Sequence, residues 1–358
     1  MRGRDRSEEH RAVLAQVVET ASSSRVDLTV VAGDLFDTGS PTPLSEEIVW
    51  SALIGLAEVA PVVVVAGNHD NPTRIDAVAP LLRMGRIIAL GSPQAPEEGG
   101  VVDLGEARVG LLPFVSQRGI VKAEDIMASD PDQNAGLYQD RMQRVLGRLT
   151  AGMGAVTVNV LVSHLTVFGG LSGGGEREAH IFGYAVPSSV FPGHLSYVAL
   201  GHLHRQQKMP HPGAVWYSGS PLHLDFGEVD DTKGVLVVEA SPGKPASVTT
   251  VPVTAGRRLV TVIGRLEEVV SRADEIGDAF VKVILTEKAR VGLADAVRAA
   301  LPDAVEVVLD SPREKVSEPE PRARLGTVEA FTRYLAERGA DDPRVEQLFA
   351  ELMDEVTV

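Results

Sequence analysis

The sequence contains no cysteine among its 358 residues. A disulfide framework and a thiolate metal site are therefore both excluded. Any metal ion held by this chain must be bound by His, Asn, Asp or Glu, and such oxygen and imidazole ligands suit manganese, iron, zinc or magnesium. The search for a metal site is thereby reduced to the places where these four residue types gather.

A net positive charge and a long apolar run are also missing. The formal net charge is −15 at pH 7, which argues against a general nucleic-acid coat, although a local arginine patch can still bind phosphates on an acidic protein. The first ten residues, MRGRDRSEEH, include no apolar stretch of signal-peptide length, and no run approaches the roughly 18 apolar residues that span a membrane. We therefore expect a cytoplasmic location and no membrane partner.

Helical and strand patterns alternate along the first half of the chain. Residues 7–22 have apolar side chains at helical spacing, with Ser7 as the expected cap, and a second helical pattern at 43–59 lies between two valine-rich strands. The later half is richer in strands than in helices. This mixture favours an α/β (α+β) fold in which two sheets pack face to face with helices outside, rather than one regular doubly wound sheet.

The pattern changes near residue 255, and we interpret the chain as three parts. Residues 1–254 form the main domain. Residues 259–311 follow the order strand, helix, strand, helix, strand, which predicts a separate small α/β domain. Residues 312–358 begin with a charged, proline-bearing spacer and end in two short amphipathic helices. The apolar faces of those helices pack either on the protein's own body or on another subunit.

Residues with metal-binding side chains follow four apolar strands at the point where each strand ends. They are Asp34 in VVAGD, Asn68 in VVVVAGN, His164 in VNVLVSH, and His202 with His204 in VALGHLH. Taken singly, each is more often a turn, a cap or a satisfied polar residue, but their joint occurrence is hard to obtain by chance. Because ligand-binding crevices of α/β sheets lie at strand ends, we expect these side chains to converge.

The chemistry of this set points to phosphate esters. A carboxylate such as Asp34 can bridge two ions, and two ions about 3.5 to 4 Å apart clamp a phosphoryl group and activate water. The sequence therefore predicts metal-assisted hydrolysis of a phosphate ester.

In the order GD, GNHD, SH and GHxH, these residues resemble the calcineurin-like metallophosphoesterases, whose motifs run D-x-H, G-D, G-N-H-[DE], H and G-H-x-H. The segments DLTVVAGDLFDTGSP, ALGHLHRQQ and YSGSPLHLDFGE resemble the SbcD branch of that family more closely. The resemblance implies a two-sheet metallophosphoesterase sandwich flanked by helices, with a small α/β capping domain and C-terminal helices.

The resemblance also implies a role for each site residue. Asp34 would bridge two divalent metal ions, which the family suggests are Mn2+. One ion would be completed by Asn68, His164 and His202, and the other would be bound by His204. His69 would stabilise charge in the transition state or protonate the leaving oxygen, and Asp70 would hold its ring in the correct tautomer.

The partners implied by the resemblance are DNA and an ATPase. The activity would be hydrolysis of phosphodiester bonds at DNA ends and hairpins, in DNA repair and recombination. The C-terminal helices would dock on an SbcC-type ATPase, in a heterotetramer that contains a homodimer of this chain. The domain at 259–311 would help to select DNA ends.

One family motif, D-x-H, does not occur anywhere in the sequence. In the family it ends the first strand and supplies an Asp and a His to the first metal. Because this sequence begins with the helix that should follow that strand, we expect that a preceding segment belongs to the protein, that Met1 is a misplaced start, and that 1–254 is N-terminally truncated. The nearest pattern, HLD at 223–225, has the reverse order.

Two other functions stay open. A phosphodiesterase that acts on small molecules or phosphoproteins would share the metal motifs. A catalytically impaired scaffold would keep the partner-binding helices, with only His204 and Asp34 left for the first metal.

Overall fold

The structure is a computed structural model that describes residues 3–116, 131–174 and 184–310, together with isolated positions between 331 and 349. The chain divides into two compact units, residues 1–309 and 310–358. The expected spacer and the two C-terminal helices lie largely outside the described residues. Within the described part, no helix has both the length and the apolar character needed to cross a bilayer.

The first sheet is parallel and has the order β1-β2-β3. Its elements follow the predicted alternation of helix and strand. They are α1 (Ser7–Ser24), β1 (Thr29–Val31), α2 (Pro43–Val59), β2 (Val62–Val65), α3 (Pro72–Met84) and β3 (Ile87–Leu90). β2 is central and fully buried, whereas β1 is a half-buried edge strand that pairs with β2.

Side-chain caps set the starts of two of these helices. Thr42 accepts a hydrogen bond from the main chain of Ser45 before α2, and Asn71 does the same for Arg74 before α3. A proline occupies the first position of each helix, where its missing N–H costs nothing. The expectation that Ser7 caps α1 is wrong, because the helix already begins at Ser7.

The second sheet has six strands in the order β10-β11-β9-β6-β5-β4. Its inner strands are parallel, and the strands at both edges are antiparallel to their neighbours. The strands are β4 (Val101–Leu104), β5 (Ala107–Leu112), β6 (Val158–His164), β9 (Tyr197–Gly201), β10 (Gln207–Lys208) and β11 (Val215–Tyr217). A long helix, α6 (Pro131–Thr150), lies between β5 and β6 in the chain.

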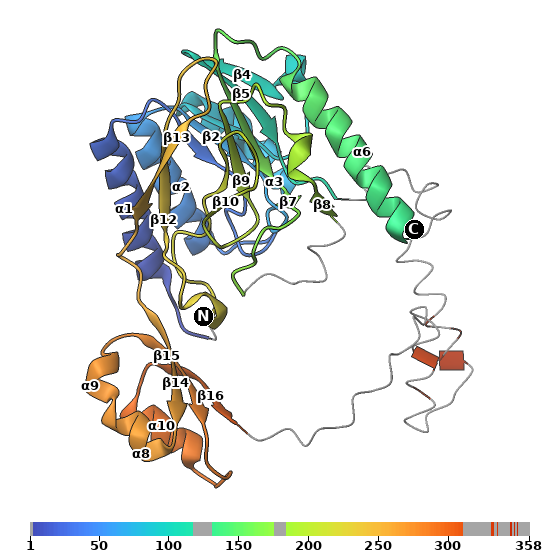
Figure 1. The fold of residues 1–358 in the computed structure, drawn as a ribbon. Helices are drawn as coiled ribbons and strands as arrows, with labels where there is room; N and C mark the ends of the chain where they lie inside the picture. The colour runs from blue at the N-terminus through green and yellow to red at the C-terminus, as the bar shows by residue number, and fades with distance from the viewer. Residues whose placement is uncertain are drawn as a thin grey trace. The chain divides into compact units, whose positions relative to one another are not determined.

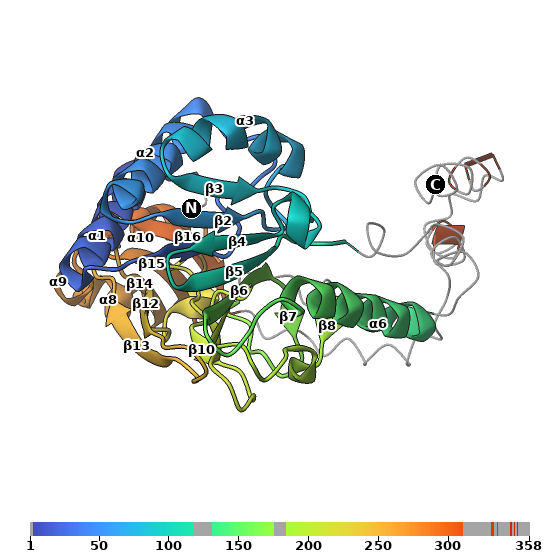
Figure 2. The same ribbon diagram turned by 90° about the horizontal axis from the view of Figure 1, so that it is seen from above.

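The two sheets pack face to face, with helices on both outer sides (Figures 1 and 2). Val63 and Val65 of β2 pack against Val109 and Leu111 of β5 in the core between the sheets. A separate core lies between the first sheet and α2, and a third joins the second sheet to α6. The expected two-sheet α/β architecture is confirmed.

Shorter elements complete this part of the chain. They are the two-stranded pairs β7 (Thr166–Val167) with β8 (Ala185–Val186) and β12 (Gly234–Glu239) with β13 (Ser247–Pro252), and the 3-10 turns η1 (Pro96–Glu98), η3 (Ser188–Val190) and η4 (Phe226–Glu228).

Residues 259–309 form a third parallel sheet, in the order β14-β15-β16, with a core of its own. The elements are β14 (Leu259–Gly264), α8 (Leu266–Ser271), α9 (Ala273–Ile276), β15 (Phe280–Leu285), α10 (Leu293–Ala300) and β16 (Ala304–Leu309). Their order agrees with the strand and helix pattern predicted for this segment. The division of the chain at 254 and 311 stays an interpretation.

Candidate metal centre

The ligand residues lie where strand ends approach one another very closely. Gly67 precedes Asn68, and a Cβ atom built on Gly67 would lie 2.1 Å from Asp34 Oδ1. Gly201 precedes His202, and a Cβ atom there would lie 1.8 Å from the carbonyl oxygen of Ala32. No side chain fits at either position, so glycine before the ligand is what allows neighbouring strand ends to come together.

Two of the predicted ligand residues have strained backbones. Asp34 has φ of 54° and His202 has φ of 102°, a region that residues with a side chain rarely adopt. Such conformations cost on the order of 1–3 kcal/mol each and persist where the surrounding structure enforces them. At these two strand ends the close approach of neighbouring strand ends enforces the conformation.

Four of the predicted ligand residues converge on one point. Potential ligand atoms of Asp34, His164 and His202 all lie within 4.8 Å of one another. Asn68 Oδ1 is 2.9 Å from His164 Nε2 and 2.8 Å from His202 Nδ1. His164 Nε2 is also 3.3 Å from Asp34 Oδ2. The side chains come from the ends of four different strands, as predicted.

The hydrogen bonds of this cluster favour a cation at its centre. His164 is fully buried, and its Nδ1 lies 2.7 Å from the carbonyl oxygen of Ala32, to which it donates. A neutral His164 therefore presents a lone pair at Nε2, where it meets two further acceptors, Asn68 Oδ1 and Asp34 Oδ2. Converging lone pairs need a positive charge between them, and the imidazole and oxygen donors fit a divalent transition metal.

Asp34 is ionised at neutral pH. Burial raises the pKa of its carboxyl group, but in the metal-free chain the hydrogen bond and charge of His164 in its protonated form, together with the main-chain N–H of His69, outweigh burial and hold the pKa at about 2. The carboxylate is therefore available to a metal ion without first losing a proton.

Asp70 serves a different purpose from the one predicted. Its carboxylate is only 6% exposed and accepts main-chain hydrogen bonds from Leu35, Phe36 and Gly67. Burial raises the pKa of Asp70, and the main-chain donors oppose that rise. Asp70 thus fastens the turn after β1 to the turn after β2, and so fixes the spacing of Asp34 and Asn68.

His69 is oriented by a carbonyl group instead. Its Nδ1 lies 3.0 Å from the carbonyl oxygen of Asp37, and its main-chain N–H donates to Asp34 Oδ1 at 3.0 Å. The expectation that Asp70 holds the His69 ring is wrong, because the Asp70 carboxylate accepts main-chain hydrogen bonds and the ring contacts the carbonyl oxygen of Asp37 instead.

His204 lies outside the cluster of Asp34, His164 and His202. Its Nδ1 lies 2.8 Å from Oε1 of Glu228, an acid that sequence reasoning missed. Burial raises the pKa of Glu228, but hydrogen bonds from His204, Leu224 and Lys233 hold it at about 2. The only available signal was that Glu228 ends the segment YSGSPLHLDFGE, because a single glutamate after an apolar turn carries no metal-site pattern of its own.

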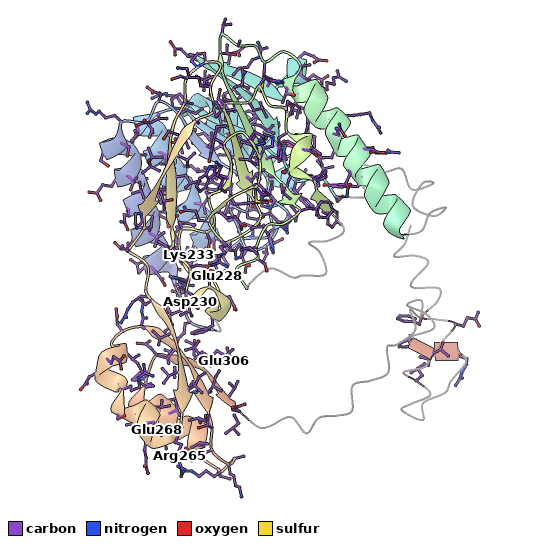
Figure 3. All side chains as sticks on the ribbon, viewed as in Figure 1. Glu228, Asp230, Lys233, Arg265, Glu268 and Glu306 are labelled. Carbon is purple, nitrogen blue, oxygen red and sulfur yellow. The ribbon has the colours of Figure 1, made fainter. Side chains whose placement is uncertain are left out.

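Glu228, Asp230 and Lys233 belong to one segment between β11 and β12 (Figure 3). Glu228 and Lys233 are buried, whereas Asp230 is exposed. The buried pair therefore acts on the interior side of this segment, where His204 lies.

Comparisons with known proteins agree with this geometry. Residues 7–206 match the family described as calcineurin-like phosphoesterase. The chain is 33% identical over 285 residues to the SbcD component of nuclease SbcCD from Bacillus subtilis, covering 77% of this chain and 72% of the relative. The protein of the same name in Rhodobacter capsulatus is 32% identical over 262 residues, covering 68% and 64%. The one in Escherichia coli K12 is 27% identical over 292 residues, covering 77% and 70%.

Proposed function

Because this chain belongs to the calcineurin-like phosphoesterase family, we propose that it is a metal-dependent nuclease subunit of the SbcD type, which hydrolyses phosphodiester bonds of DNA. The observation that carries the proposal is the convergence of Asp34, Asn68, His164 and His202 at strand ends. The curated relatives are named as nuclease subunits, and they match over most of this chain.

The proposed metal ligands follow from the cluster. Asp34, Asn68, His164 and His202 would hold one divalent ion, and Asp34 together with His204 would hold a second. We propose Mn2+ for both positions because the family resemblance suggests it; the ligand types themselves suit manganese, iron, zinc or magnesium alike. Divalent ions bound as such a pair polarise the phosphoryl group and provide a nucleophile from water at neutral pH.

His69 is the proposed acid. It is exposed, and its main chain contacts the carboxylate of Asp34, so it lies beside the metal cluster without being part of it. The carbonyl oxygen of Asp37 accepts from Nδ1 and fixes the ring, which leaves Nε2 as the atom that exchanges a proton. In the imidazolium form, Nε2 can stabilise the charge that develops on the phosphate or protonate the leaving oxygen.

The proposed partners are DNA and an SbcC-type ATPase. The relatives are named as components of the SbcCD nuclease, which supports an association with an SbcC component. We propose residues 312–358 as the part of this chain that makes the contact. We propose a cytoplasmic complex in which two copies of this chain act in DNA repair and recombination, with 259–311 as the domain that helps to select DNA ends.

The test compares hydrolysis of linear duplex DNA with that of an aryl phosphodiester, each with Mn2+, for the chain and for the chain with its ATPase partner. We expect cleavage of duplex DNA that is abolished by a chelator and strongly reduced in His69→Asn. Cleavage of the aryl ester alone would contradict the nuclease assignment and favour another phosphodiesterase.

The absence of a D-x-H motif favours a second candidate, the scaffold. A scaffold would bind the ATPase partner, and His69→Asn would leave the activity of the complex unchanged.

A further inference from the structure

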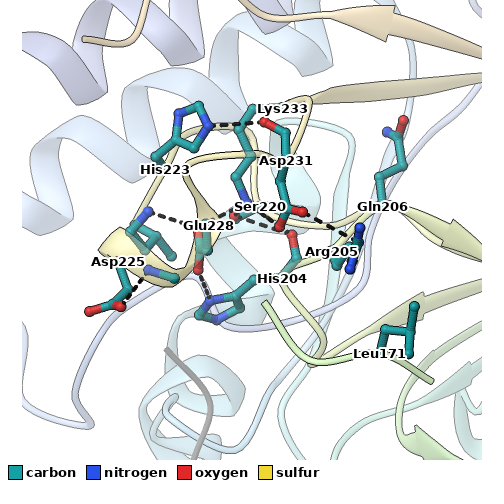
Figure 4. Close-up of polar contacts among 12 residues, drawn as sticks. Leu171, His204, Arg205, Gln206, Ser220, His223, Asp225, Glu228, Asp231 and Lys233 are labelled. Atoms are coloured by element: carbon teal, nitrogen blue, oxygen red, sulfur yellow. Dashed lines mark hydrogen bonds and ion pairs between the residues drawn. The ribbon is translucent and has the colours of Figure 1, made fainter. Parts of the chain in front are cut away.

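A buried carboxylate lies directly behind His204. Glu228 is fully buried, and its Oε1 is 2.8 Å from His204 Nδ1 (Figure 4). Its Oε2 accepts the main-chain N–H of Leu224 at 2.9 Å and is 2.9 Å from Nζ of Lys233. Both oxygens therefore face donors, and the carboxylate is fixed in one orientation.

Lys233 is the buried counter-charge of this carboxylate. Its ammonium group is near Glu228 and also donates to Ser220 Oγ at 2.9 Å and to the carbonyl oxygen of His204 at 3.1 Å. An ammonium group has three N–H donors, and these three acceptors satisfy them. A buried charge persists only when it is paired and hydrogen-bonded in this way.

The main chain around His204 is enclosed as well. The main-chain N–H of Ser220 donates to the carbonyl oxygen of His204 at 3.0 Å. A Cβ atom on Gly219 would lie 2.7 Å from that same oxygen, and Gly219 has φ of 72°. The segment from 219 to 233 therefore contacts both ends of His204, its carbonyl group and its ring.

This arrangement determines which ring nitrogen carries the proton. An ionised carboxylate accepts hydrogen bonds and donates none, so the short contact requires a proton on Nδ1 of His204. In the neutral ring, the lone pair is then on Nε2. A carboxylate in this position orients a metal-binding imidazole and raises its basicity.

We infer that Glu228, held by Lys233, is the positioning residue that fixes His204 in the tautomer whose Nε2 binds metal. The inference rests on the proposed function in one respect, that His204 binds a metal ion. His164 uses the neutral carbonyl oxygen of Ala32 for the same purpose. His204 therefore has a charged acceptor where His164 has a neutral one.

The test is the tautomer of His204 in the metal-free full-length chain, measured by long-range ¹H–¹⁵N NMR with ¹⁵N-labelled histidine. The spectrum of His204→Gln identifies the signals among the nine histidines. In the native sequence, we expect the proton on Nδ1.

In Glu228→Gln, we expect the proton to move to Nε2. Glutamine has a single acceptor oxygen for the three donors of His204, Leu224 and Lys233, and the lysine charge attracts that oxygen. The amide group then faces Nδ1 as a donor. The matched control is Glu287→Gln, a half-buried acid that pairs with Arg290 and accepts from the main-chain N–H of Leu266, which should leave the His204 tautomer unchanged.

A second readout is the Mn2+ concentration that half-saturates phosphodiesterase activity. We expect Glu228→Gln to raise it about 10- to 100-fold and Glu287→Gln to leave it unchanged.

Several results would overturn the inference. One is a native His204 protonated on Nε2, a result that does not depend on whether Glu228→Gln folds. Another is a folded Glu228→Gln chain that keeps the Nδ1 proton, or one that keeps the native Mn2+ requirement. If the chain proved inactive on DNA while the tautomer changed as expected, the proposed function would fail and the positioning role would stand.

Discussion

At the scale of single residues, a glycine directly precedes three of the proposed ligands in the sequence. Gly33, Gly67 and Gly201 each precede a proposed ligand, and at each one an added Cβ atom would collide with a neighbouring strand end or with His164. The steric reason is shared: three turns occupy a space that excludes even a methyl group. The glycines therefore define the geometry of the site as firmly as the ligands do.

This steric argument predicts the effect of Gly67→Ala. A Cβ atom 2.1 Å from Asp34 Oδ1 must displace that carboxylate, so we expect Mn2+ affinity to fall by at least about tenfold and the free energy of unfolding to fall by about 1–3 kcal/mol. Calorimetric Mn2+ titration and urea unfolding measure the two effects.

The control is Gly147→Ala in α6, where an added Cβ atom meets nothing within 4 Å. It should raise the free energy of unfolding by roughly 0.5–1 kcal/mol and leave Mn2+ binding unchanged. Native Mn2+ affinity in Gly67→Ala would contradict the steric account.

At this scale the proposed ligands follow from the sequence, but the contacts that hold them in place do not. Asp34, Asn68, His164 and His202 each follow an apolar strand directly, so a local pattern reveals them. Glu228 acts on a residue 24 positions earlier, through contacts that only the folded chain defines. The misassigned role of Asp70 has the same cause, since its donors include Leu35 and Phe36 on another turn.

At the scale of elements, α1 is linked to distant loops by one buried ion pair. Arg6 and Glu9 are almost fully buried and lie 2.7 Å apart. Arg6 also donates to the carbonyl oxygen of His223, and Glu9 accepts from the main-chain N–H of Arg257. The start of α1 thereby holds the segment of Glu228 and the segment that leads to β14.

This pair predicts a pH-dependent part of the stability. Burial raises the pKa of Glu9. The hydrogen bond and charge of Arg6 and the main-chain N–H of Arg257 lower this pKa by more than burial raises it, so the pKa in the folded chain lies below that in the unfolded chain. The stabilisation is therefore complete above the unfolded pKa, about 4.3 for a glutamate. It is lost as the pH falls through the lower folded value.

We expect Glu9→Gln to reduce the free energy of unfolding by about 3 kcal/mol at pH 7, because Arg6 is left buried without its partner. The loss should shrink below about pH 4, as Glu9 of the native chain becomes protonated. Urea unfolding at several pH values measures both. Glu47→Gln, which removes an exposed ion pair with Arg11, should change the free energy of unfolding little. An equally small loss for Glu9→Gln would contradict the role given to the buried pair.

The order of helices and strands along the chain was easier to predict than the order of strands within each sheet. Valine-rich runs and capped helices are local signals, so the alternation around β2 and the three strands of 259–309 follow from the sequence. The order β10-β11-β9-β6-β5-β4 does not, because it joins strands that are far apart in the chain and depends on how α6 packs against them.

At the scale of the whole molecule, two sheets bring their strand ends to one place. β1 and β2 belong to the first sheet and supply Asp34 and Asn68, whereas β6 and β9 belong to the second and supply His164 and His202. The site therefore forms only when the two sheets have packed, through the core that joins Val63 and Val65 to the second sheet.

The most direct test of this account is to locate the metal. Crystals of the full chain grown with Mn2+ would be measured at the manganese absorption edge, for the native sequence and for His164→Ala. We predict an anomalous peak bounded by Asp34, Asn68, His164 and His202 in the native chain, and its loss in the variant. Manganese bound elsewhere, with no peak among these four side chains, would contradict the account.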